Sequence, residues 1–456
     1  MEETLIPVCE RCKEQPAVAK TRKEYFCKEC FSKFILLKQR RTLISDKDKF
    51  LETVMKVTYK TPNDEKILLA LSFGKSSLVV LQNLIEYLNN QYSQQQKTGF
   101  ILETITVVEN DDEYKKFKEI IKTLEKLKDF EILNKGSIKF RVVNINQLLN
   151  QEKLSLLKLN IEDYKLLVED INEAASIINI NQLLIDSFGT QYKTLSSKED
   201  FKNIAIKNTI EAVFHSFNYK ALVYGSSMSK LATEIVTNTV IGRGDVIAKN
   251  LDTKFYPLTD VFYSEVDAYY QLVINNNDIL LKGEEFSSSN SILIQNDNHF
   301  EILKKSKQTK TISDITMDYF NTIEGDYANV ISTVVKTGLK LGNPNAFISA
   351  SENLKHCKIC SSNISKKQNP ADWINKITVM KPAPINTDEE RANYDHWKTE
   401  TALAVDKGSE ATNEECDNLC YGCTVTLNTS SHKSIKWNTS NKDAALLNQV
   451  LEDFVL

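Results

Sequence analysis

The feature that most constrains this chain is the placement of its nine cysteines. Four lie between Cys9 and Cys30, five lie between Cys357 and Cys423, and the sequence has none from Phe31 to His356. At both ends the cysteines occur in C-x2-C pairs, a spacing that lets two thiolates share one metal ion. The pattern predicts a small metal-binding module at each end and a long cysteine-free domain between them.

The length of 456 residues allows two to four domains, because a domain has about 100–200 residues. No apolar run approaches the ~18 residues of a membrane-spanning helix, so no membrane association is expected. The chain begins Met-Glu-Glu, without the basic and apolar regions of a secretory signal. We therefore expect a cytoplasmic protein, in which disulfides are rare and close cysteine pairs bind metal.

The first module has the pattern Cys9-x2-Cys12-x14-Cys27-x2-Cys30. Four thiolates complete the tetrahedral shell of a zinc ion and leave no open position, so the zinc is expected to be structural. Two alternatives remain open at this point: an iron–sulfur site, or reduced cysteines in a small hydrophobic cluster.

A basic stretch with interleaved aromatic residues overlaps this module. Eight basic and two acidic side chains lie between Lys20 and Arg41, although the whole chain has a net charge of −4. One interpretation is a surface that contacts nucleic-acid phosphates; the other is a solvated helix face with the aromatics packed on the module. The candidate phosphate-binding residues are Lys20, Arg22, Lys23, Lys38, Arg40 and Arg41.

The middle of the chain alternates apolar runs with helical patterns, which is typical of repeated βα units in a parallel α/β sheet. A helical pattern also runs from Asp112 to Lys128, and another from Ile312 to Thr337. The predicted strands are Lys66–Ser72, Leu102–Val108, Ile138–Asn144 and Ala221–Tyr224.

The first predicted strand runs into Ser72-Phe73-Gly74-Lys75-Ser76-Ser77. A phosphate-binding Walker A loop is excluded, because its first glycine would fall at Leu69 inside the strand. A degenerate pyrophosphate loop, normally S-G-G-x-D-S, fits better, with Phe73 in place of a glycine and Ser76 in place of the aspartate. The loop is therefore either a weakened nucleotide or anion site or a serine-rich helix cap without a ligand. The candidate ligand-binding residues are Ser72, Gly74, Ser76 and Ser77.

A second loop follows the fourth predicted strand. Enzymes that adenylate through a pyrophosphate loop commonly carry G-H-x-x-D-D-x-A-E-T here, then a helix and an R-G turn. Gly225 and the Arg243-Gly244 turn remain in this sequence. The acidic pair has become Ser229 and Lys230, so carboxylates that could hold Mg²⁺ are missing.

The second cysteine module consists of Cys357, Cys360, Cys420 and Cys423, again a candidate four-thiolate zinc site but with a long spacer. Two neighbours remain as alternatives. Cys416 is either an ordinary thiol or a substitute ligand, and His356 could also replace one cysteine. The predicted organisation is thus a zinc module with its basic stretch at 1–45, a degenerate pyrophosphate-loop α/β domain at 46–350, and a zinc module with an acidic mobile segment at 351–456.

In this combination the sequence resembles the cytoplasmic tRNA 2-thiolation protein 2 family, in its fungal form, over essentially the whole chain. The segments that carry the resemblance are Cys9–Cys12, Arg22–Phe31, Lys66–Ser72, Tyr224–Leu231, Asn329–Val334 and Leu419–Cys423.

The resemblance implies an adenine-nucleotide α-hydrolase type of sheet and a heterodimer with an intact pyrophosphate-loop tRNA thiolase. It implies sulfur transfer to C2 of the wobble uridine U34 in tRNAs for Lys, Glu and Gln. The implied sulfur donor is a thiocarboxylated ubiquitin-related modifier protein. Active thiolases carry cysteines in the pyrophosphate-loop domain, and this chain has none from Phe31 to His356.

These features are compatible with three functions. The first is a non-catalytic subunit that stabilises the thiolase, helps to bind tRNA through the basic stretch and does not itself bind ATP. The second is an ATP-dependent tRNA sulfurtransferase in its own right. The third is a zinc-ribbon interaction scaffold without a role in RNA binding.

Overall fold

The computed structural model describes the sheet domain, both cysteine modules and several connecting helices. The described residues are 7–43, 54–57, 65–108, 111–125, 137–144, 164–170, 176–180, 194–247, 253–274, 310–341, 355–357, 360, 363–364, 387–396, 420, 422–423 and 426.

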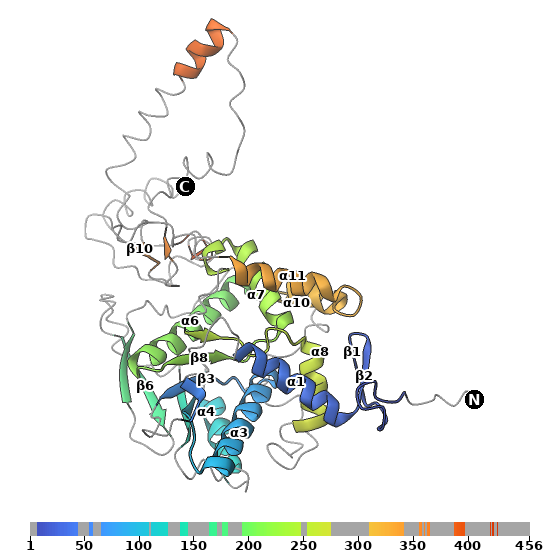
Figure 1. The fold of residues 1–456 in the computed structure, drawn as a ribbon. Helices are drawn as coiled ribbons and strands as arrows, with labels where there is room; N and C mark the ends of the chain where they lie inside the picture. The colour runs from blue at the N-terminus through green and yellow to red at the C-terminus, as the bar shows by residue number, and fades with distance from the viewer. Residues whose placement is uncertain are drawn as a thin grey trace.

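A seven-stranded sheet forms the centre of the protein, in the order β7-β6-β5-β4-β3-β8-β9 (Figure 1). Five neighbouring strands are parallel, and β6 and β7 extend one edge in antiparallel fashion. The bounds are β3 Lys66–Ala70, β4 Ile101–Val108, β5 Ile138–Asn144, β6 Tyr164–Asp170, β7 Ser176–Ile180, β8 Ala221–Tyr224 and β9 Lys254–Phe255.

The predicted α/β fold with a parallel sheet is confirmed, and all four predicted strands are present. The predicted helix from Asp112 lies at α4, Asp111–Glu125. The pattern from Ile312 forms two helices, α10 Ile312–Ile323 and α11 Ala328–Lys340, because a turn containing Gly325 separates them. Strands β6 and β7 were not predicted.

Helices cover both faces of the sheet, and the strand residues alternate between them. Ile67 and Leu69 of β3 join a core with α3 Lys75–Gln95 and α4, whereas Leu68 joins a second core with α6 Leu195–Ser216. A strand buried on both faces needs an uninterrupted apolar run, which explains why β3 was readable from the sequence.

A third apolar cluster lies beside the carboxyl end of β8. It joins α7 Met228–Ile241 to α10 and α11, through buried residues that include Leu231, Phe320 and Ile331. Ser227 caps α7, and Gly242 ends it in the left-handed conformation at φ 86°. This layer places the second loop, Gly225–Ser227, and the turn at Arg243 at the two ends of one helix.

The N-terminal module is a small hairpin, β1 Ala19–Thr21 and β2 Glu24–Phe26, followed by α1 Lys28–Leu43. Phe31 and Ile35 of α1 are fully buried in the same core as the sheet residues. The remaining named elements are η5 Gly244–Val246, α8 Tyr263–Tyr269, the π-helical turn η6 Tyr270–Ile274, β10 Lys355–His356 and β11 Asn363–Ile364.

The acidic segment predicted in the C-terminal region, Asp388–Asp417, is helical over residues 388–396, and residues 397–419, including Cys416, lie outside the described residues. Among the described residues, no helix is both long and apolar enough to cross a membrane.

A buried ionic network ties three strands together on the α6 side of the sheet. Glu103 of β4 is fully buried and accepts hydrogen bonds from Arg141 Nε at 2.7 Å and from the Tyr219 hydroxyl at 2.5 Å. Lys66 Nζ lies 3.4 Å from the same carboxylate. Burial opposes ionisation of Glu103, but the hydrogen bonds from Tyr219 and Arg141 outweigh it and lower its pKa.

Removing this carboxylate should strongly destabilise the sheet. Breaking a buried ion pair by losing one partner costs about 3–5 kcal/mol, so Glu103→Gln should lower the midpoint of urea unfolding. The pKa of Glu103 is lowered on folding, so its contribution is complete above the unfolded value of ~4.3 and fades at lower pH. The difference from wild type should therefore shrink in acid.

The matched control is Glu24→Gln, which breaks the exposed Arg11–Glu24 pair and should change stability by less than about 1 kcal/mol. Equal effects of the two substitutions would contradict the role assigned to Glu103.

Candidate metal centres and the switch-point loops

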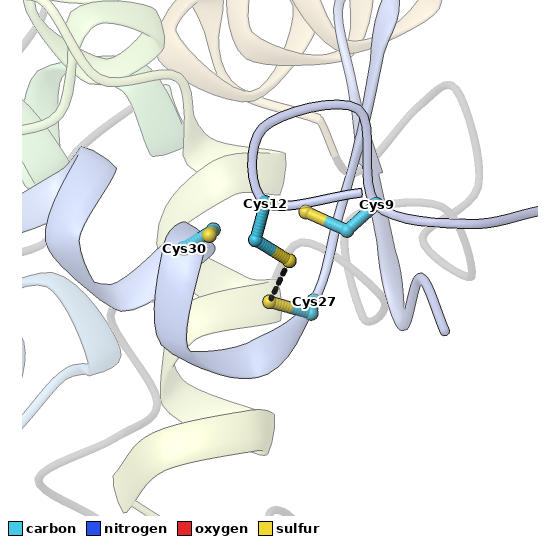
Figure 2. Close-up of side chains that lie close together, drawn as sticks. All are labelled: Cys9, Cys12, Cys27 and Cys30. Atoms are coloured by element: carbon cyan, nitrogen blue, oxygen red, sulfur yellow. Dashed lines mark hydrogen bonds between the residues drawn. The ribbon is translucent and has the colours of Figure 1, made fainter. Parts of the chain in front are cut away.

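The N-terminal cysteines form a compact group of four sulfur atoms (Figure 2). Their sulfurs all lie within 4.8 Å of one another, and Cys12 Sγ is 3.8 Å from Cys27 Sγ. A tetrahedral shell with metal–sulfur bonds of ~2.3 Å places its sulfurs ~3.8 Å apart. The four residues therefore fit one metal ion.

Local backbone structure explains how the two knuckles meet. Lys13 has a left-handed φ of 58° and donates its N–H to the Cys9 carbonyl oxygen at 2.8 Å, which folds the first knuckle back. Phe31 N–H donates to the Cys27 carbonyl oxygen at 2.9 Å, so the second knuckle leads directly into α1.

The electrostatics of this group are those of a cation-binding donor set. Burial opposes ionisation of Cys9, but backbone N–H donors of Cys12, Cys27 and Arg11 outweigh it and lower the pKa of Cys9 to about 6. Hydrogen bonding to Cys27 raises the pKa of Cys30 to about 12. Four thiols at this separation do not all ionise near neutral pH on their own, whereas a bound divalent cation stabilises all four thiolates.

The C-terminal cysteines come together across the long spacer. Cys357, Cys360, Cys420 and Cys423 also place their sulfurs within 4.8 Å of one another, and Cys360 Sγ lies 3.5 Å from Cys420 Sγ. Cys357, Cys420 and Cys423 are buried. These four sulfurs form a second donor group that fits a metal ion.

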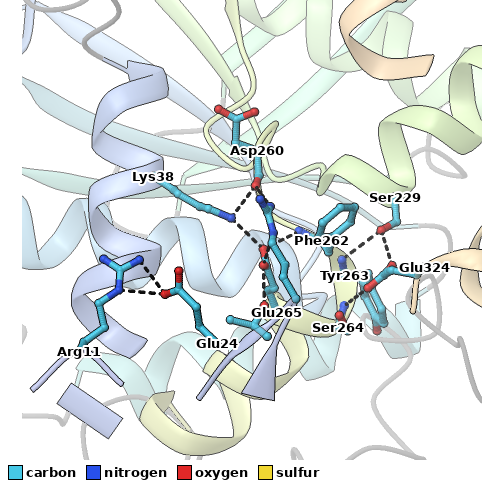
Figure 3. Close-up of polar contacts among 12 residues, drawn as sticks. Arg11, Glu24, Lys38, Ser229, Asp260, Phe262, Tyr263, Ser264, Glu265 and Glu324 are labelled. Atoms are coloured by element: carbon cyan, nitrogen blue, oxygen red, sulfur yellow. Dashed lines mark hydrogen bonds and ion pairs between the residues drawn. The ribbon is translucent and has the colours of Figure 1, made fainter. Parts of the chain in front are cut away.

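A buried carboxylate of α8 holds the N-terminal module against the sheet domain (Figure 3). Glu265 accepts hydrogen bonds from Thr21 Oγ1 at 2.6 Å, Arg22 Nε at 3.0 Å and Lys38 Nζ at 3.1 Å. The Glu265 side chain is only 1% exposed. Arg22 Nη2 and Lys38 Nζ also donate to the Asp260 carbonyl oxygen, at 3.0 and 2.9 Å.

The six basic residues singled out from the sequence thus fall into two sets. Arg22, whose side chain stays 44% exposed, and Lys38 contact the sheet domain of their own chain. The remaining four, Lys20, Lys23, Arg40 and Arg41, are exposed and form the exposed set. Glu265 was not predicted, because nothing local to residue 265 indicates a partner more than 200 positions away.

The two loops after β3 and β8 lie at the point where the strand order reverses. The order β5-β4-β3-β8-β9 turns back between β3 and β8, and ligands of open parallel sheets bind at such a point, outside the carboxyl ends of the strands. The loops are in contact: a Cβ on Gly225 would lie 2.6 Å from Ser77 Cα. Only glycine permits this approach.

Within the first loop the serines bond mainly to one another. Ser77 Oγ donates to the Gly74 carbonyl oxygen at 2.9 Å and lies 3.3 Å from Ser72 Oγ. Gly74 N–H points at Ser72 Oγ, 3.4 Å away. Ser76 Oγ is buried and has no hydrogen-bond partner among the described residues. The four predicted residues are therefore brought together at the start of α3.

Phe73 keeps the backbone shape of a glycine while filling the core with its side chain. Its φ is 56°, a left-handed conformation that costs a non-glycine residue about 1–2 kcal/mol. The ring is 2% exposed and packs edge-on against Phe117 of α4, with centroids 5.9 Å apart. Phe adopts a positive φ less readily than glycine does, and packing against Phe117 offsets that cost.

Acidic side chains from distant elements contact residues of both loops. Lys75 Nζ at the start of α3 lies 2.5 Å from Asp267 Oδ1 of α8. Ser229, which replaces one residue of the motif's acidic pair, donates to Glu324 Oε2 at 2.7 Å. Glu324 Oε1 accepts from Ser264 N–H at 3.2 Å. Asp267 and Glu324 were not predicted, since each reaches the loops only through the tertiary fold.

The described geometry defines an α/β protein with a parallel sheet, a modified loop at its switch point and a four-cysteine group near each end. The sequence profile described as cytoplasmic tRNA 2-thiolation protein 2 matches residues 311–425.

Curated relatives with that name match nearly the whole chain. The protein from Kluyveromyces lactis is 33% identical over 98% of this chain and 98% of its own length. The one from Vanderwaltozyma polyspora is 34% identical over 99% and 97%, and that from Saccharomyces cerevisiae S288c is 30% identical over 98% of both chains. This chain belongs to the cytoplasmic tRNA 2-thiolation protein 2 family.

Among solved structures, the chain is similar to the U34-tRNA thiolase NcsA from Methanococcus maripaludis, determined with its 4Fe-4S cluster. The match has a TM-score of 0.45 and 17% identity, and it covers 78% of this chain and 95% of that chain.

Metal retention should depend on both cysteine groups and on pH. Cys12→Ser and Cys360→Ser should each remove one metal equivalent from the purified protein, because the remaining three thiolates bind more weakly. Metal ligation requires deprotonated thiolates, so protons compete with the metal and acid should release it. Plasma emission spectrometry after dialysis at falling pH measures both effects; unchanged metal content in either variant would remove that group as a site.

Proposed function

We propose that this protein is the non-catalytic subunit of a heterodimeric complex that thiolates tRNA in the cytoplasm. Its partner is an intact pyrophosphate-loop thiolase. The complex transfers sulfur from a thiocarboxylated ubiquitin-related modifier to C2 of U34 in tRNAs for Lys, Glu and Gln. Family membership over nearly the full length is the observation that carries the tRNA 2-thiolation role.

The assignment as non-catalytic rests on what the switch-point loops lack. Transfer of sulfur through the enzyme needs cysteines, either as a reactive thiolate or as ligands of an iron–sulfur cluster, and the sequence has no cysteine from Phe31 to His356. The loop positions of a glycine and an aspartate are Phe73 and Ser76, and Lys75 is paired with Asp267. A chain with these residues supports its partner and does not activate tRNA with ATP.

Zinc is proposed as the metal in both four-cysteine groups. Two C-x2-C knuckles with all sulfurs within 4.8 Å form a closed tetrahedral donor set. The eight cysteine ligands stabilise the two modules. The N-terminal module presents the basic surface that is proposed to bind tRNA.

The non-catalytic assignment predicts no nucleotide turnover by this chain alone. Calorimetric titration of the purified protein with ATP and Mg²⁺ should give no binding heat, and incubation with tRNA should give no adenylated product. Co-expression with the thiolase partner should yield a heterodimer by native mass spectrometry. ATP binding and tRNA adenylation by the isolated chain would instead establish the alternative function, an independent sulfurtransferase.

The tRNA-binding role is assigned to the exposed set of basic residues, Lys20, Lys23, Arg40 and Arg41. Reversing Lys23, Arg40 and Arg41 to Glu in the assembled complex should weaken tRNA binding at least about tenfold. It should also lower the salt dependence, because each lost phosphate contact removes about one unit of the slope. Filter binding at several salt concentrations measures both quantities.

The matched control reverses Lys115, Lys336 and Lys340, which are exposed residues of α4 and α11 and change the net charge equally. Arg22 and Lys38 are left intact, so that the N-terminal module stays attached through Glu265. Equal loss in both triple variants, or no loss in either, would overturn the assigned surface; unchanged binding would favour the zinc-ribbon scaffold without an RNA role.

A further inference from the structure

A buried arginine of the sheet domain contacts the C-terminal cysteine group. Arg243 follows Gly242, the left-handed residue that ends α7, and it is only 4% exposed. Its Nη2 lies 3.6 Å from Cys423 Sγ, with a geometry that donates a hydrogen bond to the sulfur. The side chain therefore reaches from the α/β domain to a predicted metal ligand 180 positions away.

Two further residues hold this guanidinium in place. Asp200 of α6 forms a two-pronged ion pair with it: Oδ1 pairs with Nη1, and Oδ2 lies 2.6 Å from Nη2. Thr426 Oγ1 accepts from Arg243 Nη2 at 3.3 Å and lies 2.8 Å from Asp200 Oδ2. All three side chains are buried, so the guanidinium has little freedom to turn away from the sulfur.

The cysteine knuckle is shaped to lie across the arginine stem. A Cβ on Gly422 would stand 2.4 Å from Arg243 Cγ, so any other residue there would push the knuckle and the stem apart. Thr426, four residues further on, also has its hydroxyl 2.8 Å from the Gly422 carbonyl oxygen. The contact is thus built from both sides.

We propose that Arg243 is a positioning residue of the C-terminal metal site. A divalent ion with four thiolates carries a net charge of about −2, and a cationic N–H donor on one sulfur stabilises that charge. Hydrogen bonds to metal ligands orient them and raise metal affinity, typically by about 10–100-fold. The arginine also couples metal binding to the packing of α6 and α7, because Asp200 belongs to α6 and Arg243 directly follows the C-cap of α7.

The N-terminal site provides an internal comparison. There Cys9 accepts backbone N–H groups, and the Arg11 side chain pairs with Glu24 in a half-exposed position. Arg11 also lies over the rings of Phe26 and Phe34. Loss of the Arg11 charge should therefore leave the metal of its own module in place.

The experiment follows metal release from the full-length protein under excess chelator, with a colorimetric zinc indicator. In Arg243→Gln, one of two metal equivalents should leave about 10–100-fold faster, whereas Arg11→Gln should release both at the wild-type rates. Arg243→Lys keeps the charge but cannot bridge Asp200 and Cys423, so it should be intermediate. Wild-type release from Arg243→Gln, or equal acceleration of both equivalents, would overturn the proposal.

A spectroscopic measurement separates a bond to the sulfur from a general structural role. In protein reconstituted with Co²⁺, loss of the N–H donor should shift the sulfur-to-cobalt charge-transfer band of one site. Thr426→Val, which leaves Arg243 and all ligands in place, serves if Arg243→Gln does not fold, and it should accelerate release of the same single equivalent. An unshifted band in Arg243→Gln, or wild-type release from Thr426→Val, counts against the proposal.

This inference rests on the C-terminal group holding a metal, which is part of the proposed function. Wild-type protein with only one metal equivalent, bound by the N-terminal group, would overturn this inference and the proposed C-terminal zinc site. The proposed role in tRNA thiolation is tested separately by the heterodimer and tRNA-binding measurements.

Discussion

A buried carboxylate paired with an arginine lies where each cysteine module meets the α/β domain. Glu265 receives Arg22 and Lys38 from the N-terminal module, and Asp200 holds Arg243 against the C-terminal one. A charge taken out of water is costly unless a well-placed partner and further hydrogen bonds compensate it. Both carboxylates meet this condition, since Thr21 completes the first network and Thr426 the second.

These pairs help to fix the position of the cysteine modules on the α/β domain. A closed four-thiolate site stabilises only the few residues around it, and a separate contact must fix the module to a larger body. In the N-terminal module that contact also includes Phe31 and Ile35, which enter the core of the sheet domain. The result is a basic surface held in a defined orientation, as a tRNA-binding role would require.

The switch-point loops keep part of the geometry of a ligand-binding site. The left-handed backbone at Phe73 and the close approach of Gly225 to Ser77 retain the shape of the site. Two of its polar side chains have partners elsewhere in the chain, because Lys75 pairs with Asp267 and Ser229 bonds to Glu324. In the proposed function the fold serves as a scaffold for the partner, and the loop positions expected to bind nucleotide or Mg²⁺ carry Phe73, Ser76 and Ser229.

The sequence by itself determined the elements whose signal is local. Apolar and β-rich runs identified β3, β4, β5 and β8, and the C-x2-C spacing identified all eight cysteines that form the two groups. Only the tertiary structure decided which charges meet, because the partners of Arg22, Lys38 and Arg243 lie between 43 and 243 positions away. A side-chain charge has no preferred partner along the chain. Pairing with the buried Glu265 separates Arg22 and Lys38 from the exposed set of basic residues, which is the surface proposed to bind tRNA.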